Sequence, residues 1–176
     1  IIIDDKKVRI GGIAKGSGMI HPNMATMLSF ITTDVNIDDK TFKDLLKEIA
    51  DDTYNMISVD GDTSTNDSVI AFANGMAGNE VLTKEHKDYN VFKDALMFVC
   101  KHLATQIVKD GEGATKFLAV NVLNAKTKDD AKKIAKSIIG SSLVKTAFFG
   151  EDANWGRVLC AAGYSGVDFD PNIVTL

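Results

Sequence analysis

Three polar, glycine-rich segments carry the residue types with which enzymes do chemistry. They cover residues 15–28, 60–67 and 150–157, and they combine hydroxyl, carboxylate, lysine and histidine side chains with glycine. Helix and strand propensities are low in such segments, and sequences break local structural preferences where function demands it. Each segment alone would also suit an ordinary turn. Together they are the candidate functional site.

Common nucleotide and metal motifs do not fit these segments. In a P-loop the lysine comes after the second glycine and beside Ser or Thr, whereas Lys15 lies ahead of its glycine. A calcium-binding EF-hand that started at residue 60 would need Gly and Glu where this sequence has Thr65 and Ala71. Cys100 and His102 lie two residues apart on a predicted helix, so they point to different faces. We therefore predict no metal site and no cofactor.

The elements that must position these segments are predicted from periodicity. Apolar residues recur at spacings of three and four in residues 42–57, 89–111 and 131–140, which indicates three amphipathic helices. Gly111 is a candidate left-handed cap for the second helix. Runs rich in Val, Ile, Phe and Thr predict strands at residues 8–13, 26–33, 68–74, 117–123 and 143–149. This pattern is typical of an α/β (α+β) fold.

Composition narrows the class of protein. The chain has 176 residues, of which 45% are hydrophobic and 25% are charged, and a net charge of −4. This balance gives no reason to expect nucleic acid or an anionic membrane as a partner. We find no linker and expect one domain over residues 1–176. Because the chain starts without Met, we expect a piece of a cleaved or truncated precursor. Cys100 and Cys160 lie in apolar stretches, which predicts reduced core cysteines in a reducing compartment.

Four segments together resemble a known enzyme family. They are residues 15–28 with Ala25-Thr26 at their centre, residues 60–67, residues 111–116 and residues 154–157. In this order they are similar to the ornithine acetyltransferase (glutamate N-acetyltransferase) family of arginine biosynthesis. The resemblance spans essentially the whole chain. It implies a layered sheet-and-helix sandwich of the self-cleaving ornithine acetyltransferase and aminopeptidase type.

The resemblance also implies self-cleavage between Ala25 and Thr26. Residues 1–25 would then be the end of an α chain, and residues 26–176 would be most of a β chain whose first residue is the nucleophile. The chemistry suits Thr26, because a freed α-amino group with a pKa of about 7.7–8.0 can accept the hydroxyl proton. From the residues alone, Thr26 would be an ordinary β-branched strand residue.

Two further residues of this sequence fall on substrate-binding positions of the family, and Thr26 is counted with them. Lys15 can pair with a substrate carboxylate, and Glu112 can take the ammonium group of ornithine or glutamate. Read without the family, they would be a solvated lysine and a surface acid at a helix end. The family's oxyanion-stabilising Thr-Gly pair and its C-terminal substrate-binding Asn and Thr are not present in this chain.

The implied activity is transfer of acetyl from N2-acetylornithine to glutamate through an acetyl-Thr26 intermediate. The implied partners are the two substrates and the α and β chains of one precursor, assembled as two of each in the cytoplasm. Acetyl-CoA as an additional donor is left open. Two alternatives remain at this point. One is a related amidase or aminopeptidase that uses water as the acceptor, and the other is a non-catalytic scaffold fragment.

Overall fold

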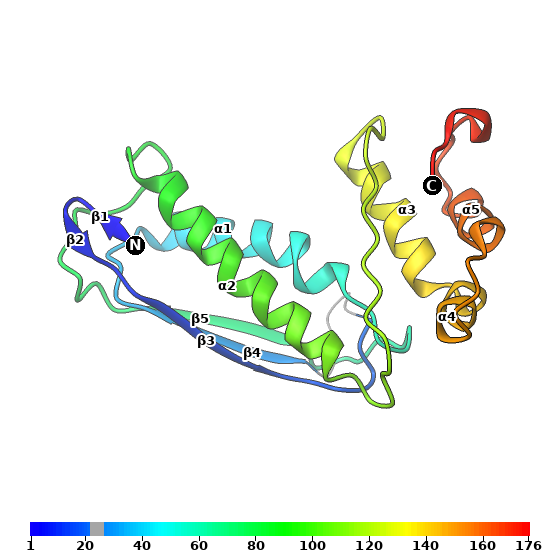
Figure 1. Ribbon diagram of the computed structural model, residues 1–176. Helices are drawn as coiled ribbons and strands as arrows, with labels where there is room; N and C mark the ends of the chain where they lie inside the picture. The colour runs from blue at the N-terminus through cyan, green and yellow to red at the C-terminus, as the bar shows by residue number, and fades with distance from the viewer. Residues whose placement is uncertain (22–26) are drawn as a thin grey trace. The chain divides into compact units, whose positions relative to one another are not determined.

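The computed structural model describes residues 1–21 and 27–176. The chain divides into two compact units, Ile1–Glu112 and Gly113–Leu176. Helices and strands both contribute, so the predicted mixed α/β fold is confirmed (Figure 1). Among the described helices, none combines the length and the apolarity that a membrane span requires. That residues 1–176 act as a single catalytic-domain fragment stays a prediction.

The first unit contains a three-stranded sheet, two long helices and a small hairpin. Its elements are β1 (Ile2–Ile3), β2 (Lys6–Lys7), β3 (Ile10–Lys15), β4 (Leu28–Thr33), α1 (Asp39–Asp52), the 3-10 turn η1 (Tyr54–Met56), β5 (Ser68–Ala73) and α2 (Tyr89–Lys109). The sheet has the order β3-β4-β5. Two of the predicted helices and three of the predicted strands are thus confirmed, apart from their end residues.

The strand directions decide which loops meet. β3 runs antiparallel to β4, whereas β5 runs parallel to β4. In this register Leu28 pairs with Lys15 on one side and with Ser68 on the other. A parallel pair needs a long crossover, which here contains α1. The segments that follow β3 and precede β4 and β5 therefore meet at one end of the sheet.

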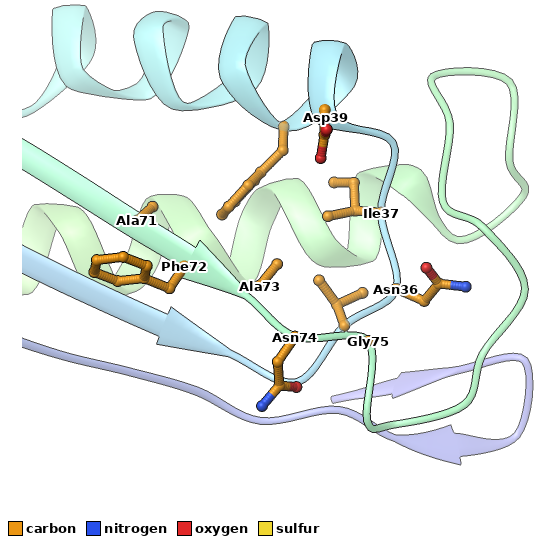
Figure 2. A pocket seen from close by; sticks show the side chains of 10 residues that line it. Asn36, Ile37, Asp39, Ala71, Phe72, Ala73, Asn74 and Gly75 are labelled. Carbon is orange, nitrogen blue, oxygen red and sulfur yellow. The ribbon is translucent and has the colours of Figure 1, made fainter.

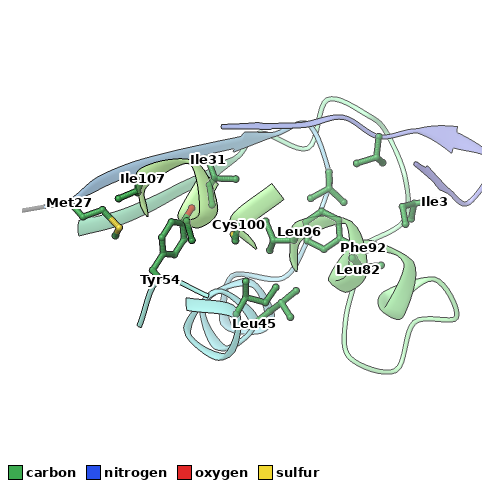
Figure 3. Close-up of a cluster of buried hydrophobic side chains, with 14 of the residues drawn as sticks. Ile3, Met27, Ile31, Leu45, Tyr54, Leu82, Phe92, Leu96, Cys100 and Ile107 are labelled. Atoms are coloured by element: carbon green, nitrogen blue, oxygen red, sulfur yellow. The ribbon is translucent and has the colours of Figure 1, made fainter. Parts of the chain in front are cut away.

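Both long helices cover the same face of this sheet (Figure 1). In β4 the alternate residues Ser29, Ile31 and Thr33 are buried, as expected for a strand with one covered face. Figure 3 shows Ile31 within the core beside side chains from the helices. Gly12 of β3 allows α2 to come close, because a Cβ there would lie 2.9 Å from Leu103 Cδ1. The opposite face of the sheet exposes apolar side chains, namely Ile13, Phe30, Ile70 and Phe72.

The second unit consists mainly of helices. They are α3 (Lys128–Gly140), α4 (Ser142–Phe149), α5 (Trp155–Gly163) and the short 3-10 turn η2 (Pro171–Ile173). Thr127 caps the N-terminus of α3, because its side-chain oxygen accepts the N–H of Asp130 at 3.1 Å. Ile138, Val144 and Ala161 are buried in a small core between the three helices. The predicted helix at residues 131–140 is confirmed as part of α3.

Three predictions for cysteines and strands are wrong. Residues 143–149 form α4 and not a strand, since the Ser141 hydroxyl accepts the N–H of Val144 at 3.4 Å and starts a helix despite the β-branched composition. Residues 117–123 form no strand, and within the described residues no strand pairs with them. Cys160 is exposed on α5, whereas Cys100 is buried as predicted, and both thiols are free.

Candidate active site

The Asp60 carboxylate joins two of the predicted segments. Its Oδ2 accepts the N–H of Met19 at 2.6 Å, and its Oδ1 accepts the N–H groups of Ile20 and Asp62, each at 3.0 Å. Met19 has a positive φ of 57°, which is uncommon for a residue other than glycine. Successive N–H groups in such a conformation form a concave site for an anion, which Asp60 fills. The strained turn is therefore held from the neighbouring segment.

A second set of contacts fastens the same two segments. The Ser58 hydroxyl lies 3.0 Å from Nδ1 of His21, and the Thr63 hydroxyl donates to the His21 carbonyl at 3.0 Å. The N–H of Val59 donates to the carbonyl of Ile20 at 2.6 Å. Side chains and backbone thus fix the chain up to His21, the last described residue before position 27.

Glu112 is brought to this cluster from the end of α2. Its N–H donates to the carbonyl of Ser17 at 2.7 Å. Its carboxylate reaches Gly18, where a Cβ would lie 2.8 Å from Glu112 Oε2. Glu112 is exposed, so its carboxylate can meet a ligand that arrives from solvent.

Gly111 has a different role from the one predicted. The helix ends at Lys109 with Asp110 as its cap, and Gly111 is not left-handed. Gly111 is buried, and a Cβ there would lie 3.0 Å from both Val59 Cγ1 and the carbonyl oxygen of Val108. Its small size therefore lets the end of α2 pack against the segment before β5.

The predicted lysine lies at the same end of the sheet as the first residue of β4. Lys15 is the last residue of β3, is exposed, and pairs in register with Leu28. Ala25 and Thr26 lie outside the described residues. Described parts of residues 15–28 and 60–67 thus meet with Glu112 in one cluster.

Asp67 is a residue of this cluster that sequence reasoning did not single out. It is only 6% exposed, and its Oδ1 accepts the N–H of Met27. Its Oδ2 is enclosed and accepts no hydrogen bond from any described residue. Burial raises the pKa of this carboxyl above its ordinary value. The available signal was an acid directly ahead of the predicted strand at residues 68–74.

Comparison with known proteins places this arrangement in a family. A model of the ArgJ family matches residues 1–176, the whole chain. The chain belongs to the ArgJ family. The predicted resemblance is thereby confirmed.

The ArgJ family relatives are closely similar in sequence but longer. The chain is 58% identical over 172 residues to the arginine biosynthesis bifunctional protein ArgJ of Geobacillus kaustophilus, covering 98% of this chain and 42% of that protein. It is 57% identical over 176 residues to a protein of that name from Bacillus cereus, covering 100% of this chain and 43% of that protein. The chain therefore spans about two fifths of the length of these relatives.

A solved ArgJ structure has the same fold. The crystal structure of the arginine biosynthesis bifunctional protein ArgJ from Bacillus halodurans matches with a TM-score of 0.81 and 54% identity. The match covers 82% of this chain and 68% of that chain. The layered α+β fold predicted from the resemblance is thus supported by a structure of the family.

The fourth segment of the ArgJ resemblance makes contacts within the second unit. Asn154 caps the N-terminus of α5, because its side-chain oxygen accepts the N–H of Arg157 at 3.2 Å. Nη1 of Arg157 donates to the carbonyl of Leu143 at 3.1 Å and lies 3.2 Å from the Thr146 hydroxyl. These contacts join α5 to α4, which is a structural role for residues that the sequence marked as a site candidate.

Two other features of the ArgJ-family chain lie outside the candidate site. A pocket of about 460 Å³ is lined mainly by residues 35–37 and 71–75, at the opposite ends of β4 and β5 (Figure 2). Along β4, the five steps of about 3.3 Å from Leu28 to Thr33 put this end of the sheet roughly 17 Å from the candidate site. Asp4, Glu80 and His86 also come together, but Asp4 Oδ2 accepts from His86 Nε2 at 3.1 Å and from the Glu80 N–H at 3.2 Å. Lys87 Nζ lies 3.4 Å from Asp4 Oδ1. The hydrogen bonds and ion pairs within this cluster therefore account for its arrangement without a metal ion.

Proposed function

We propose that the complete protein containing this chain is a self-cleaving acetyltransferase that moves acetyl from N2-acetylornithine to glutamate. The observation that carries the proposal is that residues 15–21, residues 60–67 and Glu112 come together where β4 begins, in a chain of the ArgJ family. Cleavage between Ala25 and Thr26 would make residues 1–25 the end of an α chain and residues 26–176 most of a β chain.

Self-cleavage prepares the nucleophile. The Thr26 hydroxyl attacks the Ala25 carbonyl, the peptide C–N bond breaks, and the acyl group moves from nitrogen to oxygen. Water then hydrolyses this ester, which releases the Ala25 carboxylate and leaves Thr26 with a free amine and a free hydroxyl. The amine can now accept the hydroxyl proton, so one residue supplies the base and the nucleophile.

Acetyl transfer then follows in two steps. Thr26 Oγ attacks the amide carbonyl of N2-acetylornithine, and the departing ornithine nitrogen takes the proton that the Thr26 amine had accepted. The amine of glutamate next attacks the acetyl ester, a proton returns to Thr26 Oγ, and N-acetylglutamate leaves. The cycle regenerates the enzyme and consumes no cofactor.

Lys15 and Glu112 are assigned to substrate binding. Lys15 is an exposed cation at the end of β3, in register with Leu28, two residues beyond the proposed nucleophile. Glu112 presents an exposed carboxylate beside Gly18. Each substrate carries a carboxylate and an ammonium, which is the δ-ammonium in N2-acetylornithine and the α-ammonium in glutamate, so two opposite charges at this end of the sheet suit both.

Intact mass of the purified complete protein tests the proposal. We expect wild type to yield two chains, the second beginning at Thr26, and we expect Thr26→Ala to remain one chain without transfer activity. Thr26→Ser should retain part of both functions, because it keeps a hydroxyl. Thr32→Ala, an exposed threonine on the same strand, is the matched control and should cleave normally. A Thr26→Ala protein that cleaves and transfers acetyl like wild type would contradict the proposal.

The acceptor is identified in the same preparation. We expect N-acetylglutamate to form from N2-acetylornithine and glutamate at a rate well above the release of free acetate. Release of acetate at an equal rate with and without glutamate would instead identify water as the acceptor, and the protein would be an amidase.

A further inference from the structure

The Asp67 carboxylate is a buried acid that the proposed reaction leaves unexplained. One oxygen holds the N–H of Met27, while the other is enclosed and has no donor among the described residues. A buried acceptor without a donor disfavours folding, and an uncompensated charge does so more strongly. Burial accordingly raises the pKa of this carboxyl. An acid kept at such a position is better explained by the reaction than by the fold.

An ammonium group is the donor that matches this free oxygen. A carboxylate only accepts hydrogen bonds, and its strongest partners are cationic N–H groups. The proposed reaction supplies two of them, the α-ammonium that forms when the freed Thr26 amine accepts the hydroxyl proton and the ammonium of the amino-acid substrate. Oδ1 of Asp67 holds the N–H of Met27, which directly follows the proposed new terminus in sequence. Glu112 is exposed and Asp67 is buried, so the two acids offer separate sites.

We propose that Oδ2 of Asp67 binds an ammonium group during acetyl transfer while Oδ1 holds the backbone of Met27. The inference rests on the proposed function. In either case a buried carboxylate pairs with an ammonium, which belongs to the new terminus or to the substrate. Steady-state kinetics distinguish the two. A pair with the new terminus orients the nucleophile and affects kcat. A pair with the substrate affects KM.

Asp67→Asn in the complete protein tests this assignment. The amide keeps one oxygen for the N–H of Met27 but puts an NH₂ group, a donor, where Oδ2 stood. We expect self-cleavage at a normal rate, because no free ammonium exists before it. We expect kcat/KM for transfer to fall about ten- to a hundredfold, the usual effect of losing a charge-assisted pair. The fall in kcat/KM comes from a lower kcat if Asp67 binds the new terminus, and from a higher KM if it binds the substrate.

A melting curve and a control variant exclude a purely structural role. Asp67→Asn removes a buried charge, so its Tm should equal or exceed that of wild type. Asp94→Asn alters an exposed acid of α2, outside the candidate site, and should leave cleavage, transfer and Tm unchanged.

Three results would overturn the inference. They are unchanged transfer in Asp67→Asn, a loss of transfer that accompanies a lowered Tm, and a block of self-cleavage itself. A wild-type protein that neither cleaves nor transfers acetyl would refute the proposed function and this inference with it. Normal wild-type behaviour that Asp67→Asn leaves intact refutes the inference alone.

Discussion

Replacing Gly18 with alanine tests whether Glu112 acts from the position observed. A Cβ at residue 18 would lie 2.8 Å from Glu112 Oε2 and 3.9 Å from Asp60 Oδ2. Gly18 does not have a positive φ, so alanine fits the backbone and the change acts through these contacts. Glu112 is exposed, and its carboxylate can move away without disturbing the core. The substitution therefore displaces one functional group and spares the fold.

The size of the effect follows from the displacement. An ordinary contact starts near 3.4 Å, so the oxygen must retreat by about 0.6 Å from its place beside Gly18. Forcing a side chain out of its preferred rotamer by this route costs about 0.5–1.5 kcal/mol, which corresponds to roughly two- to twelvefold. We expect kcat/KM of the complete protein to fall by that factor while its Tm stays within about 2 °C. Steady-state kinetics and thermal melts measure both.

A double-mutant cycle decides whether the effect passes through Glu112. In a Glu112→Ala background the added methyl has no carboxylate to displace, so Gly18→Ala should have little further effect. Gly140→Ala, at a helical glycine with open space around it, is the control for adding a methyl group. Equal losses from Gly18→Ala with and without the Glu112 carboxylate would show that the reasoning is wrong.

Further predictions concern stability, reactivity and pH. Gly12→Ala places a methyl 2.9 Å from a side-chain carbon of α2, and denaturant melts should show a loss of about 1–3 kcal/mol; Gly11→Ala, whose nearest contact is 3.9 Å, should cost much less. Burial raises the pKa of Cys100 to about 11, so mass spectrometry after alkylation of the native protein should show modification of the exposed Cys160 first. Because the folded-state pKa of Asp67 is raised, its contribution to stability is present below the unfolded-state pKa and is lost as pH rises through the folded-state pKa. Asp67→Asn should therefore raise Tm at about pH 7 and lose this advantage near pH 3, and an advantage independent of pH would contradict the assignment.

The first unit was largely predictable because its local signals agree with its packing. Leu45 and Ile49 of α1 are spaced by four and both are buried, and Asp38 caps the helix by accepting the N–H of Thr41 at 2.8 Å. β4 alternates strictly, since one face lies under the helices. Periodicity of this kind reports burial directly.

The errors lie where composition and packing disagree. The β-branched and aromatic residues of 143–149 favour a strand, but Val144 and Ala147 are buried one helical turn apart behind a serine cap. The position of Gly111 after a helix predicts a left-handed cap. Its close approach to Val59 is a tertiary contact that no local pattern indicates. Asp67 escaped notice for a similar reason. Its enclosure depends on the parallel pairing of β4 and β5, which no local pattern specifies.

The antiparallel ladder between β3 and β4 has a consequence for how the mature protein would refold. The six residue pairs from Ile10–Thr33 to Lys15–Leu28 span the proposed junction, so a cut there leaves a nicked hairpin whose halves stay paired. Before the cut, the connecting residues hold the two strands at a high effective concentration. After it, the two polypeptides must find each other in solution once they have been denatured. Recovery should then become second order in protein, and the midpoint of unfolding should rise as the protein concentration is raised.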